Sequence, residues 1–337
     1  MSPLPAPSPQ RFIETATAYQ RTAALKGAIA LDLFTAIGPD DGSAGAIAQR
    51  CGASERGIRI LCDYLTVLGF ITKHGDRYAL SADSVAFLDR RSETYLGDTL
   101  EFLTSPVLAD AFADVAAAVR RGATVVAGDG TVAPEHPIWV TFARAMTPMV
   151  KSTAQALPAL IGVDPTRPLR VLDIAAGHGL FGIELARRHP QAEVVAVDWP
   201  NVLELVRANA EAAGVAERVH TLAGSAFDLD LGTGYDLVLL VNFLHHFDQP
   251  TCEALLRKVH AALLPTGRAV TIEIIPNADR VSPPPAASFS LVMLCSTPAG
   301  DAYTYAELEQ MLRRSGFGRS EIHSLSPSLE QAIISYP

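Results

Sequence analysis

The sequence predicts an α/β protein with a doubly wound, largely parallel sheet and an antiparallel final strand, preceded by an α-helical and winged-helix domain. From residue 169 to 275, short runs of branched apolar residues alternate with segments of helical periodicity, a pattern typical of parallel strands joined by crossover helices. After a further helix at 305–315, two apolar runs at 320–325 and 332–336 are joined by a short Ser-Pro turn, which indicates an antiparallel ending. Helix, helix and hairpin patterns within residues 1–100 predict the winged helix.

Composition restricts the function classes. Of the 337 residues, 49% are hydrophobic and 19% are charged, which is typical of a globular protein long enough for two domains. The net charge of −9 argues against nucleic acid or an anionic membrane surface as a partner. The Pro-rich residues 1–10 lack the features of a signal peptide and are expected to be a flexible leader. No apolar stretch reaches membrane-spanning length without a charge or a proline, so we expect a cytoplasmic protein.

The N-terminal elements follow from local patterns. Apolar residues recur at helical spacing over 11–37, which predicts one or two helices that end at the Gly-Pro-Asp-Asp-Gly sequence of 38–42. Short helices are expected at 43–51 and 54–68, the second with Ser54 as N-cap, followed by a hairpin with strands at 69–72 and 77–80.

A winged helix most often binds DNA, so this function has to be weighed. The helix expected to contact DNA offers only two cations, Arg56 and Arg59, and two carboxylates offset them. That is too little positive charge for the phosphate contacts that dominate DNA affinity. A ligand-responsive DNA-binding protein therefore remains only an alternative.

Residues 95–160 are predicted to be helical, with breaks at Gly122 and at the loop 128–137. A stripe of large apolar side chains repeats every three or four residues and shares one helical face: Trp139, Phe142, Met146 and Met149. Such a stripe is usually core, and the alternative is an apolar wall for a planar substrate.

Residues 169–198 predict a nucleotide site, because a strand, a glycine turn, a helix and a second strand follow one another. Gly177 and Gly179 let the backbone approach a ligand, and the following helix directs free N–H groups into the same space. Asp198, at the end of the second strand, is placed to accept hydrogen bonds from a ribose. Residues 177–182 match G-x-G-x-x-G, so an NAD-dependent oxidoreductase stays open. Asp173 would crowd a pyrophosphate but suits the ammonium of a methionine moiety, which favours S-adenosylmethionine.

The alternation continues with the following expected elements: helices at 200–213 and 251–263, and strands at 218–222, 235–242 and 268–275. Ligands bind at the carboxyl edge of such sheets. Three segments place candidate functional side chains at this edge. They are residues 224–227, whose Phe227 could cover an adenine, residues 242–248, with two adjacent histidines, and Glu273. A histidine with a carboxylate on the neighbouring strand end makes a general base. No His, Cys or carboxylate cluster has the spacing of a metal site, so no metal is expected.

Several motifs resemble a known family. Residues 244–248, Leu-His-His-Phe-Asp, with Cys252 downstream, are similar to the L-H-D-W-S/D segment of small-molecule O-methyltransferases of the plant caffeic-acid and bacterial hydroxyindole type. Residues 198–202, Asp-Trp-Pro-Asn-Val, resemble their D-L-P-x-V, and residues 272–276, Ile-Glu-Ile-Ile-Pro, resemble their V-E-x-x-P. The resemblance covers nearly the whole length. It implies a class I methyltransferase, Rossmann-like domain behind a helical and winged-helix dimerisation domain.

The resemblance also implies a function: a homodimeric, S-adenosylmethionine-dependent O-methyltransferase acting on a hydroxyl of a small aromatic metabolite, with His245 as general base oriented by Glu273. The cofactor-binding residues implied are Asp173, Ala175, Gly177, Gly179, Asp198, Trp199, Gly224, Ser225, Ala226, Phe227 and Asn242. The residues expected to line the substrate pocket are Phe142, Met146, Met149, Phe243, His246, Phe289 and Met293. The expected division is a leader (1–10), the dimerisation domain (11–100), connecting helices that contribute to the pocket (101–165) and the S-adenosylmethionine-binding catalytic domain (166–337).

The chain departs from the family pattern at the catalytic edge. Ala175 stands where the family usually has glycine, Ser225 replaces an acid that contacts the adenine, and His246 replaces an aspartate. The second glutamate of the family's catalytic trio falls near Ala302, and the adjacent Asp301 is one carbon shorter. A C- or N-methyltransferase of the same fold therefore stays open as an alternative.

Overall fold

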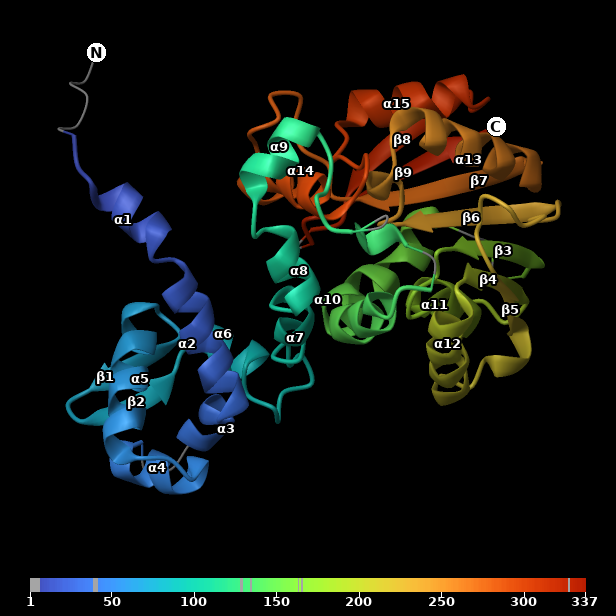
Figure 1. Ribbon diagram of the computed structural model, residues 1–337. Helices are drawn as coiled ribbons and strands as arrows, with labels where there is room; N and C mark the ends of the chain where they lie inside the picture. The colour runs from blue at the N-terminus through green and yellow to red at the C-terminus, as the bar shows by residue number, and fades with distance from the viewer. Residues whose placement is uncertain are drawn as a thin grey trace, which may run out of the picture. The chain divides into compact units, whose positions relative to one another are not determined.

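The computed structural model describes residues 7–38, 42–127, 130–133, 135–162, 164, 166–326 and 328–337. The chain divides into two compact units, residues 1–100 and residues 101–337 (Figure 1). Most of the expected flexible leader, residues 1–6, lies outside the described residues. Helix structure begins at Gln10.

The first unit contains six helices and one hairpin among its described residues: α1 (Gln10–Ala16), α2 (Tyr19–Ala30), α3 (Leu33–Ile37), α4 (Ala44–Cys51), α5 (Glu55–Val67), β1 (Ile71–His74), β2 (Arg77–Leu80) and α6 (Ala82–Phe87). The expectation of one or two helices over 11–37 is wrong, because three are present. α3 starts after Asp32, whose φ of +51° breaks the helical path without a glycine or proline to mark the break in the sequence.

The winged-helix part of this unit is confirmed. Ser43 and Ser54 cap α4 and α5, since their hydroxyls accept hydrogen bonds from the N–H groups of Ala46 and Gly57 at 3.3 and 3.1 Å. The antiparallel hairpin pairs Ile71 with Leu80. The amphipathic faces of the helices meet in one core around fully buried side chains such as Ile47, Ile58 and Leu65.

The second unit starts with helices that precede its sheet: α7 (Thr99–Leu103, across the boundary), α8 (Pro106–Ala111), α9 (Val115–Arg121), the 3-10 turn η1 (Gly130–Val132) and α10 (Ile138–Ile161). The helical prediction for 95–160 is confirmed in outline, including the end of α9 at Gly122. In the described part of the chain, no single helix has both the length and the apolar composition to cross a membrane. One bent pair, Thr99–Ala111 with Val115–Arg121, meets both criteria when its halves are taken together.

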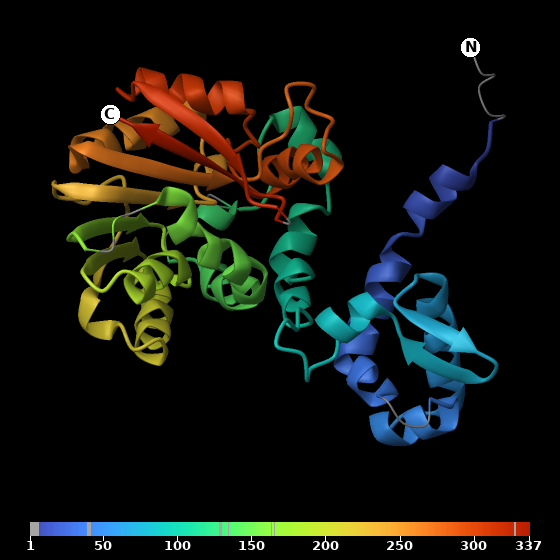
Figure 2. The same ribbon diagram turned by 180° about the vertical axis from the view of Figure 1, so that it is seen from behind.

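A seven-stranded mixed sheet forms the centre of the second unit, in the order β5-β4-β3-β6-β7-β9-β8. Its strands are β3 (Leu169–Ile174), β4 (Ala192–Asp198), β5 (Val219–Ala223), β6 (Tyr235–Val241), β7 (Leu263–Glu273), β8 (Arg319–Ser324) and β9 (Gln331–Tyr336). The first five are parallel, and β9 pairs antiparallel with both β7 and β8. Figure 2 shows the antiparallel end of the sheet from behind. The predicted doubly wound sheet with an antiparallel ending is confirmed.

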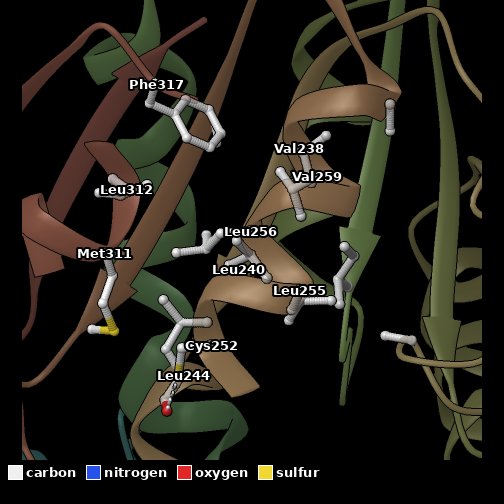
Figure 3. Close-up of a cluster of buried hydrophobic side chains, with 14 of the residues drawn as sticks. Val238, Leu240, Leu244, Cys252, Leu255, Leu256, Val259, Met311, Leu312 and Phe317 are labelled. Atoms are coloured by element: carbon white, nitrogen blue, oxygen red, sulfur yellow. Dashed lines mark hydrogen bonds between the residues drawn. The ribbon is translucent and has the colours of Figure 1, made fainter. Parts of the chain in front are cut away.

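Helices cover both faces of this sheet (Figure 1). The connecting elements are α11 (Leu180–Arg188), α12 (Pro200–Ala212), η2 (Ala216–Arg218), η3 (Leu244–His246), α13 (Gln249–Ala262), α14 (Pro284–Ser296) and α15 (Tyr305–Arg314). On one face α13 and α15 pack against the strands, as Figure 3 shows around Leu240, Leu256 and Met311. On the other face α10 and α11 do so. The sheet is therefore buried on both faces, and its parallel strands all end at one edge.

Two expectations for the second unit need correction. The strand expected at 268–275 is β7, which starts earlier, at Leu263, because this residue already pairs with Tyr235 across a register shift, and which ends at Glu273. No element was expected between 276 and 304, yet α14 lies there. The first turn of α14 contains prolines. Proline is tolerated there because the backbone N–H groups of a helix's first turn have no hydrogen-bond partner within the helix.

Candidate active site

The candidate site lies at the edge where the five parallel strands end. The sheet order places β4 and β5 on one side of β3 and β6 and β7 on the other, so the chain reverses the direction of strand addition after β5. A crevice forms outside the strand ends at such a switch point, which is where open α/β sheets bind ligands.

The turn after β3 has the predicted permissive backbone. Gly177 and Gly179 have φ values of +58° and +73°, and Ala175 has a φ of +54°, which costs more for a residue with a β-carbon. A β-carbon at Gly179 would lie 2.9 Å from Val206 Cγ1, so this glycine is also needed for close packing against α12. The helix α11 begins directly after it, at Leu180.

The two aspartates of this unit have different surroundings. Asp198 Oδ2 accepts a hydrogen bond from the Gly177 N–H at 2.8 Å, and its Oδ1 accepts one from Trp199 N–H at 2.7 Å. Asp173 is only 2% exposed, and its Oδ2 accepts from the Gly182 N–H at 3.2 Å. Burial raises the pKa of Asp173 to about 7 and also raises the pKa of Asp198 above its ordinary value, against the hydrogen bonds each accepts.

A cavity of about 380 Å³ opens beside this turn. Its lining combines residues from the ends of β3, β4, β5 and β6 with aromatic rings. Of the residues proposed from the sequence, the cavity is lined by Phe142, Ala175, Gly177, Asp198, Trp199, Gly224, Ser225, Ala226, Phe227, Asn242, Phe243 and His246. Its size suits a nucleoside with part of a small substrate.

Several proposed residues do not line this cavity: Met146, Met149, Asp173, Gly179, His245, Glu273, Phe289 and Met293. Met149 is 47% exposed, whereas Met293 is buried in the protein at 4% exposure. Phe289 lies against His245, with the ring centroids 4.9 Å apart. The binding roles proposed for these side chains stay predictions.

The cavity also has lining residues that sequence analysis did not propose: Val132, Val197, Val202, Asp228, Val241 and Phe247. Trp139 also lines the cavity, and it belongs to the stripe for which an apolar substrate wall was left open as the alternative to core. Val197 and Val241 directly precede proposed residues at their strand ends. Val132 had no signal in the sequence.

His245 and Glu273 form a buried pair at the neighbouring ends of β6 and β7. His245 Nδ1 lies 2.5 Å from Glu273 Oε2, and the two residues are 5% and 3% exposed. Glu273 Oε1 accepts hydrogen bonds from the N–H groups of Phe243 and Leu244 at 3.0 and 2.8 Å. The carboxylate is therefore held by the backbone while it binds the imidazole.

The turn that carries His245 is anchored in the core. Leu244 is fully buried, and its carbonyl accepts a hydrogen bond from the Cys252 thiol at 3.2 Å (Figure 3). Burial raises the pKa of this thiol well above its ordinary value, so it stays protonated as a donor. These contacts determine where η3 places its two histidines.

The side chain of His246 lines the cavity, whereas that of the adjacent His245 contacts Glu273. Its ring packs against Trp139 with centroids 5.1 Å apart and against His245 at 4.2 Å. Burial, with a smaller effect of His245, holds the pKa of His246 well below its ordinary value. A neutral imidazole therefore lines the cavity.

Comparison with known proteins identifies this arrangement. Residues 136–318, more than half of the chain, match the model of the O-methyltransferase domain, and residues 13–90 match that of the O-methyltransferase dimerisation domain. The chain belongs to the O-methyltransferase family. It is an S-adenosylmethionine-dependent methyltransferase of the class I fold, as the sequence resemblance implied.

Individual relatives agree with this assignment. This O-methyltransferase is 30% identical over 311 residues to 3-hydroxy-5-methyl-1-naphthoate 3-O-methyltransferase of Streptomyces sahachiroi, covering 91% of this chain and 89% of the relative. The structure of a candidate O-methyltransferase from Nostoc punctiforme is 52% identical, with a TM-score of 0.95 over 98% of this chain and 100% of that one. Human N-acetylserotonin methyltransferase in complex with S-adenosylmethionine shares the fold at 21% identity, with a TM-score of 0.82 over 100% and 99% of the two chains.

The residues of this O-methyltransferase fit its methyl donor. Asp198 is fixed by two backbone N–H groups at the end of β4, the position from which such folds bind ribose hydroxyls. Asn242 Oδ1 is buried without a hydrogen-bond partner among the described residues, in a residue that lines the cavity. An unpaired buried acceptor is costly, and a cationic donor group such as an ammonium would satisfy it.

The position of the second family glutamate can be compared with the structure. Ala302 is fully buried and cannot act as an acid or base. The carboxylate of the adjacent Asp301 forms an ion pair with Arg280, with an oxygen 3.3 Å from an Nη atom. The backbone N–H of Asp301 donates a hydrogen bond to the His245 carbonyl at 3.0 Å. Asp301 therefore supports the backbone of the histidine turn. Among the described residues no group of three or more His, Cys, Asp or Glu side chains could hold a metal ion.

Proposed function

We propose that this chain transfers a methyl group to a hydroxyl of a small aromatic metabolite, with His245 as general base and Glu273 as the residue that orients it. The observation that carries this proposal is the buried contact of 2.5 Å between His245 Nδ1 and Glu273 Oε2. The pair lies at the strand ends beside the aromatic cavity. Burial among protein groups keeps the pair in one geometry.

The pair determines which nitrogen acts. Glu273 Oε2 accepts a hydrogen bond from the Nδ1–H group, so the neutral ring keeps its lone pair on Nε2, where it takes a proton from a substrate hydroxyl. S-adenosylmethionine, when bound, supplies an electrophilic methyl group for the resulting oxygen nucleophile. The carboxylate then stabilises the imidazolium.

An aromatic substrate is supported by the walls of the cavity. Trp139, Phe142, Phe243 and Phe247 line it and offer ring faces and edges to a planar molecule. The Streptomyces relative is named for a hydroxynaphthoate, and the human structure is named for N-acetylserotonin. We therefore assign the substrate to the aromatic hydroxyl compounds.

A homodimer through the first unit is part of the proposal. The helix α1 has no buried residue, and its side chains Phe12 and Ile13 are 75% and 53% exposed. Tyr19 at the start of α2 is 68% exposed. Such apolar surface indicates an interface, and the dimerisation-domain match agrees. Light scattering should give twice the chain mass, and a monomer mass would contradict this part.

The decisive experiment replaces His245 by alanine. Turnover of an aromatic hydroxyl substrate should fall by about 10²–10⁴, the usual effect of losing a general base. Affinity for S-adenosylhomocysteine, measured by calorimetry, should stay near that of the wild type, because the role proposed for His245 is to deprotonate the substrate and not to bind the cofactor. His220→Ala is a matched control, since His220 forms an exposed pair with Glu193 at 3.0 Å.

The outcomes separate the alternatives. Unchanged turnover in His245→Ala would remove this residue from the mechanism. Mass spectrometry and NMR of the product show whether oxygen, nitrogen or carbon carries the new methyl group. A product methylated on carbon or nitrogen would overturn the assignment of a hydroxyl acceptor.

A further inference from the structure

A second buried polar pair lies at the same edge of the sheet, outside the proposed proton transfer. Asn242 follows β6 with a φ of +50° and donates from Nδ2 to Glu330 Oε1 at 2.6 Å. These residues are 88 positions apart in the sequence. The other amide atom, Asn242 Oδ1, is buried and has no partner among the described residues. The pair therefore leaves one acceptor unsatisfied beside the cavity.

Glu330 directly precedes β9, on the loop that closes the antiparallel end of the sheet. It is 8% exposed, and the Ser328 hydroxyl donates to its Oε2 at 3.0 Å. Within the described ranges it forms no ion pair with a lysine, arginine or histidine. A nearly buried carboxylate without a cation is costly, so its position calls for a positively charged ligand group nearby.

The sheet order indicates which part of the ligand lies there. The loop 224–227 and Asp198 follow β5 and β4, on one side of the β3 turn, and Asn242 follows β6 on the other side. A nucleoside held on the β4 and β5 side directs the rest of the molecule toward β3 and β6. In S-adenosylmethionine that remainder carries the sulfonium and the ammonium.

We propose that Glu330 is a positioning residue that fixes the Asn242 carboxamide, so that Asn242 Oδ1 accepts a hydrogen bond from the ammonium of the methyl donor's amino-acid moiety. A carboxylate can only accept hydrogen bonds, so it selects the amide orientation that turns Nδ2 toward itself and Oδ1 away. The charge of Glu330 adds attraction for the cation. This inference rests on the proposed function, because the ligand is its methyl donor.

The first test measures binding, not turnover. Glu330→Gln keeps the size of the side chain but removes the charge and permits both orientations of Asn242. Calorimetry should show about tenfold weaker binding of S-adenosylhomocysteine, which carries the ammonium. Binding of 5′-methylthioadenosine, which lacks the amino-acid moiety, should change by less than about twofold. Glu217→Gln removes the same charge from an exposed site before β5 and should change neither affinity.

An exchange of the two groups gives the second test. In Asn242→Asp alone, two carboxylates face each other, and S-adenosylhomocysteine should bind more weakly. In the double variant Asn242→Asp with Glu330→Gln, the introduced amide donates to one oxygen of the introduced carboxylate and leaves the other oxygen as an acceptor. Affinity for S-adenosylhomocysteine should recover to within about threefold of the wild type.

Three results would overturn the inference. Equal weakening of both ligands in Glu330→Gln would mean a general structural role. Unchanged affinity in that variant would mean no role, and failure of the double variant to recover would exclude the orienting hydrogen bond. A wild-type chain that binds neither ligand would refute the proposed function itself, a result distinct from these three.

Discussion

Replacing Asp173 by asparagine tests whether the buried carboxyl group of this residue in β3 lowers the free energy of unfolding while it strengthens ligand binding. Asp173 is 2% exposed and accepts one hydrogen bond, from the Gly182 N–H at 3.2 Å. Asparagine has nearly the same size and can accept the same bond through its Oδ1. It does not titrate, so the substitution removes the pH dependence of this site while preserving its shape.

The magnitude follows from the pKa of the carboxyl. Burial raises the pKa of Asp173 from 3.8 to about 7 in the folded protein. Between these values the folded protein keeps a proton that the unfolded chain has released, so the free energy of unfolding of the wild type falls as the pH rises. The pKa of Asp173 differs by about three units between the unfolded and the folded protein, which corresponds to about 4 kcal/mol. The free energy of unfolding of the wild type falls by this amount as the pH rises from below about 4 to above about 7.

The assay is urea unfolding of the ligand-free protein between about pH 5 and about pH 8. The free energy of unfolding of Asp173→Asn, relative to the wild type, should increase across this range by about 2.5 kcal/mol, because the rest of the difference develops below about pH 5. Asp230→Asn, at an exposed loop position, should show no such trend. A difference between Asp173→Asn and wild type that stays constant with pH would refute the reasoning. We also expect the variant to bind S-adenosylhomocysteine more weakly, because the proposed role of Asp173 is to balance the ligand's ammonium.

Two further predictions concern the supports of the site. Leu244→Ala, at a fully buried position, should lower the free energy of unfolding by about 2–5 kcal/mol, measured by denaturation. It should also reduce turnover more than it reduces cofactor affinity, measured by calorimetry. The control is Val67→Ala, at a position that is 80% exposed, which should change the free energy of unfolding by less than about 0.5 kcal/mol. Lys258 Nζ donates to the carbonyls of Ala226, Phe227 and Leu229 at 2.9, 2.7 and 2.8 Å. Lys258→Met should therefore loosen this cavity wall and weaken the binding of 5′-methylthioadenosine about tenfold. The control Arg257→Met should leave this binding unchanged, and equal affinities of the two variants for the ligand would contradict the prediction.

Regular patterns in the sequence were enough to predict most of the fold. The alternation of apolar runs and helical segments from 169 to 275 was confirmed, as were the winged helix and the antiparallel ending. The failures have local causes. The breaks between the first three helices occur at residues other than glycine or proline, and α14 lacks a polar face and begins among prolines, so no periodicity marked either feature.

What the sequence determined by itself is the set of strand-end residues. Parallel strands joined by helices must bring Gly177, Asp198, Asn242 and Glu273 to one edge, because every strand of this kind ends on the same side of the sheet. The spacing along the chain then suffices to place them within one site.

Only the tertiary structure decided which of these side chains face a ligand and which support it. His245 and Glu273 are buried beside the cavity while His246 lines it, although the two histidines are adjacent in the sequence. The contact of Asn242 with Glu330 joins residues 88 positions apart. Such contacts depend on how α10, α14 and the β8–β9 loop pack over the strand ends, and side-chain packing between distant segments leaves no periodic signal in the sequence.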